Sequence, residues 1–282
     1  MFLKKKGKIY IFLKKNLSTK VKHCIYYFLH FKNNIKIKFP VWIFKLLITN
    51  IYDQNNNKLF TLRNLGGSTI SRGFSMFRSD PEVCEWIDKF SKNSVLVDIG
   101  ANIGLYSLYA AKKGHDVIAV EPESQNFACL NLNISDNNFS NKISAFPIAI
   151  NNEFKISYLN MMQMKFGGSG STFERKINDH GTQFDSVYRQ GSISLTLDYL
   201  LEKTSIIPNY IKIDVDGNEL RVIKGMERIL REGSLKSICI ELCPDFDEHL
   251  EAMEILKKTF KKFNKHQWYD GQTVFNYIFY KI

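Results

Sequence analysis

The first fifty residues contain no acidic side chain. They hold twelve lysines, and the first carboxylate of the chain is Asp53. Taking these twelve charges from the formal net charge of +11 leaves −1 for residues 51–282, which are therefore close to neutral. The basic character belongs to an amino-terminal arm, residues 1–50, and the overall charge does not indicate a nucleic-acid-binding face. We expect nucleic acid not to be a partner.

Cysteine is scarce and has no pairing pattern. The five cysteines are odd in number, and no two of them form a C-x-x-C pair. Cys239 and Cys243 flank an apolar run, as buried core cysteines do. These features exclude a disulfide framework and a zinc site, and they favour a reducing, cytoplasmic compartment. We expect no metal ligands.

Long uncharged runs are also missing from the arm. Its longest, residues 23–31, has nine residues, where about 20 are needed to cross a bilayer. The apolar stretch at 9–13 is too short for a signal peptide and lacks a small-residue cleavage site. Lysines alternate with aromatic and aliphatic residues here, which is typical of peripheral contact with an anionic inner-membrane surface. A coding bias towards lysine is the alternative explanation.

Strand and helix patterns alternate from Ser94 onwards. Short apolar runs at 95–99, 117–120, 143–148, 210–215 and 237–242 are suited to strands covered on both faces. Amphipathic helical patterns lie between them. We therefore predict an α/β fold over 94–282 with a doubly wound, mostly parallel sheet. A turn at Asp270-Gly271 predicts an antiparallel C-terminal hairpin. Residues 51–93 are expected to be a lead-in of strands and a helix that starts near Pro81.

One segment, residues 150–195, interrupts this alternation. It is polar, has little periodicity and contains the run Gly167-Gly168-Ser169-Gly170-Ser171. Loops this long in compact domains are usually functional or disordered. We expect the segment to lie over the carboxyl edge of the sheet, as a long insertion on the acceptor side of a binding site.

The most informative string is Asp98-Ile-Gly-Ala-Asn-Ile-Gly104, which runs from a strand end into a helix start. It fails the G-x-G-x-x-G pattern of dinucleotide sites, because Asn102 and Leu105 occupy the later glycine positions. An acid at Asp98 suits a cationic group better than a pyrophosphate. Glu121, at the end of the next strand, can accept hydrogen bonds from a ribose diol. Together these residues favour S-adenosylmethionine.

This string resembles the FkbM family of S-adenosylmethionine-dependent methyltransferases. The resemblance extends through Glu121-Pro122 and through Ile211-Lys-Ile-Asp-Val-Asp-Gly-Asn-Glu-Leu220. It implies the seven-stranded class I (Rossmann-like) methyltransferase fold and methyl transfer to oxygen, often a sugar hydroxyl of a glycan or related metabolite. The family usually has Glu at the position of Asp216 and often Ala at that of Asn218.

The resemblance also implies which residues bind the cofactor. The turn after the first strand is expected to hold the methionine end, Glu121 the ribose, and Ala149 to lie near the adenine. The expected cofactor-binding residues are Asp98, Gly100, Ala101, Asn102, Gly104, Tyr106, Glu121, Pro122, Ala149 and Asp214.

A methyl acceptor must also lose a proton, and Asp214 is the predicted catalytic base because it ends the fourth strand beside the expected methyl group. Glu241 and His180 are alternatives. A divalent ion shared by Asp214, Asp216 and Glu241 is a further alternative. Two rival functions stay open: an RNA or protein methyltransferase of the same fold, and an inactive cofactor-binding module at a membrane surface.

Overall fold

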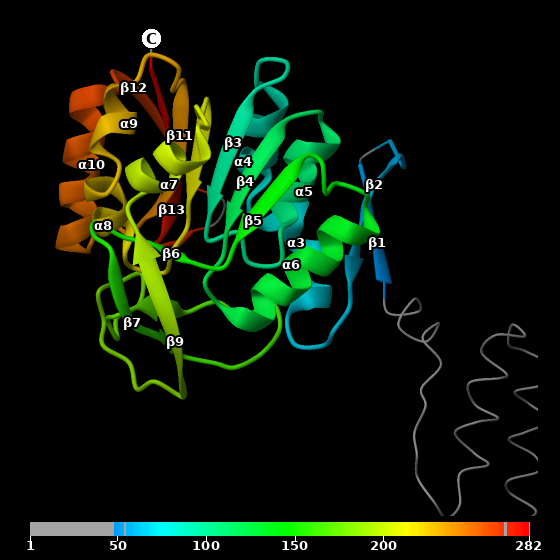
Figure 1. The fold of residues 1–282 in the computed structure, drawn as a ribbon, viewed down its shortest axis with the longest axis horizontal. Coiled ribbons are helices and arrows are strands. Elements are labelled where there is room, and N and C mark those ends of the chain that lie inside the picture. Colours follow the sequence, from blue (N-terminus) through cyan, green and yellow to red (C-terminus); the bar gives the residue numbers. More distant parts are fainter. Residues whose placement is uncertain (1–47, 54, 268–269, 282) are drawn as a thin grey trace, which may run out of the picture. The chain divides into compact units, whose positions relative to one another are not determined.

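The computed structural model describes residues 48–53, 55–267 and 270–281. Its main sheet has seven strands in the order β12-β13-β11-β10-β3-β4-β5 (Figure 1). β3, β4, β5, β10 and β11 are parallel, and β13 pairs antiparallel with β11 and β12. The bounds are β3 Val95–Ile99, β4 Asp116–Val120, β5 Ile143–Phe146, β10 Tyr210–Ile213, β11 Ser237–Leu242, β12 Lys262–His266 and β13 Phe275–Tyr280.

The parallel strands form where the sequence offers short, mostly apolar runs. β10 is buried along its whole length, and β3 along four of its five residues, as expected for strands with helices on both faces. The seven-stranded, mostly parallel sheet and the antiparallel C-terminal hairpin predicted from the sequence are confirmed. The register aligns Ile213 of β10 with Ile99 of β3, so the residues that follow both strands emerge at one edge.

Two layers of helices cover the sheet. One apolar cluster joins the sheet to four helices on its first face: α3 Thr69–Ser79, α4 Pro81–Asp88, α5 Leu105–Lys112 and α6 Ser124–Asp136. A second cluster joins it to the helices of the opposite face: α7 Leu197–Thr204, α8 Glu219–Lys224, α9 Glu227–Arg231 and α10 Asp247–Thr259. The fold is thus doubly wound, as predicted.

The lead-in consists of β1 Ile48–Tyr52, β2 Lys58–Arg63 and the helices α3 and α4. The sequence predicted the start of α4 at Pro81 but not α3. Apolar side chains of the lead-in, such as Phe60 and Trp86, pack in the same cluster as those of β3 and α5. The predicted basic arm lies outside the described residues, except for its last three, which begin β1. Cys24 also lies outside them.

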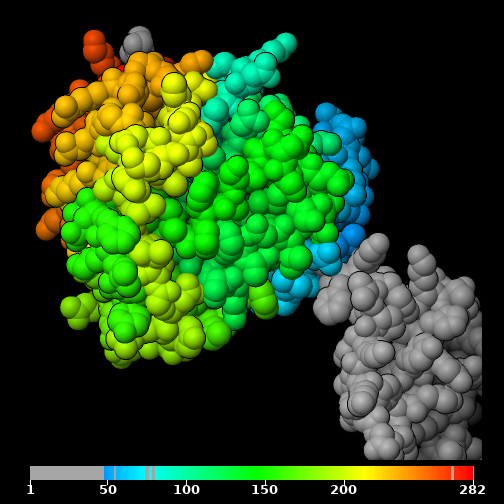
Figure 2. Space-filling view, in the orientation of Figure 1, coloured from blue at the N-terminus to red at the C-terminus, as the bar shows by residue number. Residues whose placement is uncertain are grey.

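The prediction of a loop over residues 150–195 is wrong in part. A four-stranded sheet of order β6-β9-β7-β8 occupies this segment, with bounds β6 Ala149–Ile150, β7 Lys155–Met161, β8 Ser171–Phe173 and β9 Tyr188–Leu195. Its alternation was missed because Ile156 and Tyr158 of β7 are exposed, so apolar residues lie on both faces. In Figure 1 this small sheet lies beyond one end of the main sheet, and in Figure 2 it forms one continuous surface with the C-terminal helices.

The cysteines that the structure describes are all buried, with free thiols. None of the helices in the described part of the chain is long and apolar enough to cross a membrane.

Candidate active site

A cavity of about 300 Å³ lies at the carboxyl ends of β3, β4, β10 and β11. In open α/β sheets this edge is the usual position of ligands, and the volume is at the lower end of the range for small-molecule sites. Leu159, Ser171 and Phe173 of the small sheet form the opposite wall. The small sheet therefore closes the cavity from outside.

The turn after β3 is built for close approach of the backbone. Gly100 has φ +79°, and a Cβ there would lie 1.8 Å from the carbonyl oxygen of Asp214. Asn102 also has a positive φ, 52°, and its amide side chain donates to the carbonyl of Gly168 at 2.7 Å. Only glycine fits at the first of these positions, since both its φ and its contact exclude a side chain.

Glu121 follows β4 and faces this turn. Its carboxylate accepts the backbone N–H of Asn102 at 2.7 Å and that of Glu123 at 2.9 Å. Burial raises the pKa of Glu121 to about 8 in spite of these two hydrogen bonds. Each carboxylate oxygen has a second lone pair, so Glu121 can still accept from a ligand hydroxyl.

Asp98 occupies a different place from the one expected. Its carboxylate is 1% exposed and accepts a hydrogen bond from the Ser107 hydroxyl at 2.6 Å. Burial raises its pKa, although Lys212 and Ser107 act in the opposite direction. Its other oxygen, Oδ1, has no hydrogen-bond partner. Asp98 lies beneath the turn and does not line the cavity.

The structure thus brings together six of the ten predicted cofactor residues. Those that line the cavity are Gly100, Asn102, Glu121, Pro122, Ala149 and Asp214. Those that do not are Asp98, Ala101, Gly104 and Tyr106. Gly104 is the N-cap residue of α5, with φ +92°, and the Tyr106 hydroxyl donates to Asp80 at 3.0 Å.

Asp214 forms an ion pair that the sequence did not predict. Its Oδ2 lies 2.9 Å from Nζ of Lys212, whose side chain is 4% exposed, against 38% for Asp214. Burial acts against ionisation, but the Lys212 ammonium prevails and lowers the pKa of Asp214. Asp214 is therefore a stable anion at the cavity wall and a weak proton acceptor.

Four other acidic side chains line the cavity: Asp80, Asp179, Asp216 and Glu241. Burial raises the pKa of each, to about 7 for Asp216 and well above its ordinary range for Glu241, where Asp214 and Asp179 add repulsion. Arg72 is the one basic side chain among the described residues of the lining. A ligand that carries positive charge would lower these raised pKa values and ionise the carboxyl groups around it, so the cavity favours such a ligand.

A glycine-rich strap, residues 165–173, crosses the cavity. On one side the Asn126 amide holds its backbone, donating to the Gly168 carbonyl at 3.1 Å and accepting the Gly167 N–H at 2.8 Å. On the other side Asp216 accepts the N–H groups of Gly170 and Ser171 at 2.8 and 3.1 Å. The strap joins the turn after β3 to the loop after β10.

Sequence reasoning missed Arg72, Asp80, Asn126 and Asp179 as lining residues. Asp80-Pro81 was interpreted only as a helix start, and the others stand in segments without a motif. His180, an alternative base, does not line the cavity and lies with Nδ1 3.3 Å from Sγ of Cys243. Among the residues described, no group of three or more His, Cys, Asp or Glu side chains could hold a metal ion.

Comparison with known proteins decides the family. A family profile described as "Methyltransferase FkbM domain" matches residues 98–263. The chain belongs to the FkbM methyltransferase family. The matched region runs from the end of β3 to β12 and includes the cavity turn, Glu121, Asp214 and Glu241. The protein is therefore a methyltransferase, as the sequence predicted.

Two curated relatives of this FkbM methyltransferase bear related names. "Methyltransferase 1" of Beauveria bassiana is 25% identical over 191 residues, covering 62% of this chain and 74% of the relative. "Hexuronic acid methyltransferase AglP" of Haloferax volcanii is 25% identical over 171 residues, covering 55% of this chain and 59% of the relative. Of AglP, the match therefore spans little more than half.

Solved structures of other methyltransferases are also similar. The "METTL16 MTase domain" has a TM-score of 0.47 at 14% identity, covering 86% of this chain and 89% of that one. The precorrin-6y C5,15-methyltransferase of Geobacter metallireducens has a TM-score of 0.44 at 12% identity, covering 73% and 89%.

Proposed function

We propose that this FkbM methyltransferase uses S-adenosylmethionine to methylate a hydroxyl group of a glycan or related metabolite. The observation that carries the proposal is the shared cavity of the Gly100 turn, Glu121 and Asp214. These residues provide a close backbone approach, an acceptor for ribose hydroxyls and a stable negative charge. A dinucleotide would instead bring a pyrophosphate into a lining rich in carboxylates.

The residues present fit S-adenosylmethionine. Gly100 lets the turn after β3 lie against the backbone of Asp214 at the cavity wall, and the acidic lining would attract the positive charge of a sulfonium. When bound, the cofactor would supply an electrophilic methyl group on positively charged sulfur. Glu121 would hold the ribose, the turn at 100–104 the methionine end, and Ala149 would lie beside the adenine. Asp98 and Tyr106 would act from outside the cavity wall.

We assign the acceptor side of the cavity to the ends of β10 and β11. Methylation of an acceptor hydroxyl would release the hydroxyl proton. A carboxylate must take that proton. Asp214 is the base that the sequence predicted, and its ion pair with Lys212 supports a second role as the counter-charge to the cofactor. Glu241, whose pKa is raised, is the stronger base of the two once it is ionised, and the positive charge of a bound cofactor would favour that ionised form.

A hydroxylated acceptor is supported by the resemblance to a relative named as a hexuronic acid methyltransferase. The decisive test has two arms. Calorimetry with S-adenosylmethionine and with NAD should give binding of the first alone, and NAD binding alone would refute the cofactor. Labelled methyl groups from S-adenosylmethionine should then enter the host's own glycan extract. Label appearing in RNA or protein instead would favour the rival acceptors.

We also propose a cytoplasmic protein with peripheral contact at the inner membrane surface. The twelve lysines of residues 1–50 support it, since each basic residue near an anionic bilayer adds about 1 kcal/mol of binding. Removal of residues 1–47, which leaves β1 intact, should abolish co-sedimentation with vesicles containing phosphatidylserine and leave cofactor affinity unchanged. Unaltered co-sedimentation would refute this part.

A further inference from the structure

The loop between β10 and α8 contains an unfavourable backbone conformation. Asp216 has φ +56°, in the left-handed region that residues with a Cβ rarely adopt. Gly217 follows with φ +111°, and a Cβ there would lie 2.6 Å from the carbonyl oxygen of Asn178. Such a loop persists only if its surroundings hold it.

Glu219 holds the backbone on both sides of Asp216. Its Oε1 accepts the N–H of Val215 at 3.1 Å, and its Oε2 accepts the N–H of Gly217 at 3.0 Å. The side chain is 2% exposed, so these bonds form away from water. One buried carboxylate thereby fixes the N–H groups of the two residues on either side of the left-handed residue.

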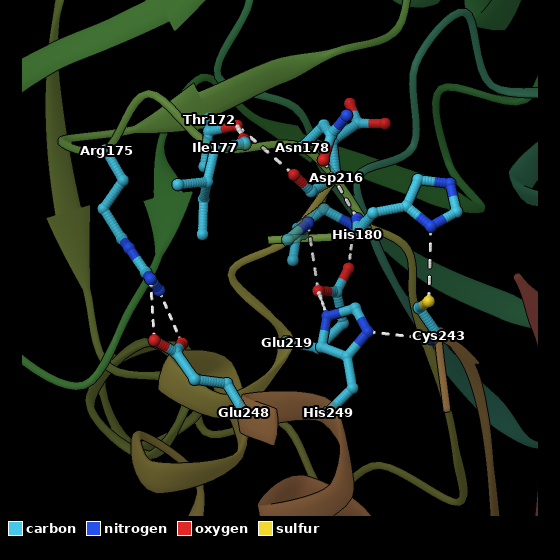
Figure 3. A network of polar contacts seen from close by, with 12 residues as sticks. Thr172, Arg175, Ile177, Asn178, His180, Asp216, Glu219, Cys243, Glu248 and His249 are labelled. Carbon is cyan, nitrogen blue, oxygen red and sulfur yellow. Dashed lines mark hydrogen bonds and ion pairs between the residues drawn. The ribbon is translucent and has the colours of Figure 1, made fainter. Parts of the chain in front are cut away.

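His249 of α10 completes the arrangement. Its Nδ1 accepts the backbone N–H of Cys243 at 2.8 Å, and its Nε2 lies 2.6 Å from Oε2 of Glu219. Because Nδ1 is an acceptor, the ring is neutral with its proton on Nε2, and it donates that proton to Glu219. Figure 3 shows the imidazole between Glu219 and Cys243, both of which it contacts edge-on. The His249 side chain is 1% exposed.

Glu219 and His249 connect the segments that follow β10 and β11, two strands whose carboxyl ends line the cavity. Cys243 directly follows β11, two residues after Glu241, whereas Glu219 holds the loop that follows β10 and Asp214. The link continues into the strap, because the Asp216 carboxylate accepts the N–H groups of Gly170 and Ser171. The path from α10 to the strap thus consists of hydrogen bonds joined by the backbone of residues 215–217.

We propose that Glu219 and His249 are positioning residues of the methyltransferase, which act through Asp216 to hold the strap over the cavity. That the strap serves methyl transfer rests on the proposed function, whereas the hydrogen bonds that hold the strap do not depend on it. Neither side chain lines the cavity, so neither touches the cofactor or the acceptor directly.

Polar substitutions can remove the hydrogen bonds of this path one at a time. Glu219→Gln has one acceptor oxygen where the wild type has two, so it leaves a backbone N–H unaccepted. His249→Asn can keep the acceptor for Cys243 and loses the donor to Glu219, whereas His249→Gln can keep the donor and loses the acceptor. Glu248→Gln is the matched control: it neighbours His249 on α10 and loses a two-bond ion pair with Arg175, at 2.5 and 2.7 Å.

The readout is amide hydrogen exchange at Gly170 and Ser171, measured by NMR in the full chain beside the thermal midpoint. We expect Glu219→Gln and both His249 variants to exchange about tenfold faster there, and Glu248→Gln to match the wild type. In an Asp216→Asn background, Glu219→Gln should add less than about twofold, since the path is already cut. If Glu219→Gln acted only by lowering the overall stability, it would accelerate exchange in this background by the same factor, about tenfold.

Exchange at the wild-type rate at Gly170 and Ser171 in the folded Glu219→Gln and His249→Asn proteins would overturn the proposal. The proposal would also fail if Glu219→Gln accelerated this exchange as much in the Asp216→Asn background as in the wild type. Calorimetry with S-adenosylmethionine on the same samples separates the two ideas. If the wild type fails to bind it while the exchange pattern holds, the proposed function falls and the positioning pair stands. If all variants bind it equally but exchange differs as expected, the strap is held by the pair but does not govern the cofactor.

Discussion

Nζ of Lys212 lies 2.9 Å from Oδ2 of Asp214, and the two side chains are 4% and 38% exposed. The cation is buried in the sheet, whereas the anion lies at the cavity wall. Because Asp98 is aligned with Lys212 on the neighbouring strand, the ammonium also faces a second buried carboxylate. This arrangement fixes a negative charge at the end of β10 and keeps it ionised.

That relationship predicts different results for two isosteric substitutions. Asp214→Asn removes the counter-charge and should weaken S-adenosylmethionine binding by about tenfold. Glu241→Gln should leave that affinity within about threefold of the wild type and lower the rate of methyl transfer by about 10²- to 10⁴-fold, the usual contribution of a general base. Calorimetry and a single-turnover assay with labelled cofactor measure the two effects. If Asp214→Asn alone loses turnover and binds normally, Asp214 is the base.

Cofactor affinity should depend on pH through Glu121. Its pKa is raised to about 8 by burial, so in the free protein at pH 7 it is mostly protonated. Ribose hydroxyls and a cationic ligand favour the ionised form, so binding lowers this pKa and releases a proton. Affinity should therefore rise from pH 6 to about 8 and then level off.

Calorimetry in two buffers of different ionisation enthalpy measures that proton directly. Glu121→Gln should bind more weakly and lose most of the rise near pH 8, where Asp216, with a pKa of about 7, is already largely ionised. The free protein should lose stability over the same range, because a raised carboxyl pKa means that the folded state binds more protons than the unfolded state. Affinity that is independent of pH would exclude Glu121 from the ribose site.

The Gly100 turn should tolerate no side chain. Gly100→Ala would place a Cβ 1.8 Å from the Asp214 carbonyl oxygen at φ +79°, and we expect a loss of about 2–5 kcal/mol of unfolding free energy. Gly114→Ala is the control, because its φ of +97° is equally unfavourable but no atom lies within 4 Å of the added Cβ. It should cost only about 1–2 kcal/mol. Equal losses in urea unfolding would mean that the close approach to β10 is unimportant.

The parallel part of the main sheet could be predicted from the sequence because each of its strands is a short, mostly apolar run between turn residues. β3 and β11 were predicted with the bounds that the structure gives. The small sheet was not predicted because the apolar residues of β7 change face between Tyr158 and Leu159, and because β6 and β8 have only two and three residues. A strand this short has no period to detect.

The candidate site divides in the same way. Gly100, Asn102, Glu121 and Asp214 follow strands directly, so their place at the sheet edge could be inferred from order alone. Asp98 lies within β3, one residue before the strand ends, and its side chain points beneath the turn towards Ser107. Arg72 and Asp179 reach the cavity from the lead-in and the insertion, and only tertiary packing brings them there.

The strap gives the last prediction. Asn126 makes two hydrogen bonds to its backbone, through the Gly167 N–H and the Gly168 carbonyl, and is 3% exposed. Asn126→Ala leaves both strap groups without this partner, so we expect S-adenosylmethionine binding to weaken by about tenfold, mainly through faster dissociation. Asn131→Ala, on the exposed side of the same helix, loses a bond only to Phe127 and should bind as the wild type does. Stopped-flow dissociation measures the difference. Equal dissociation rates in the two folded variants would mean that the strap does not retain the cofactor.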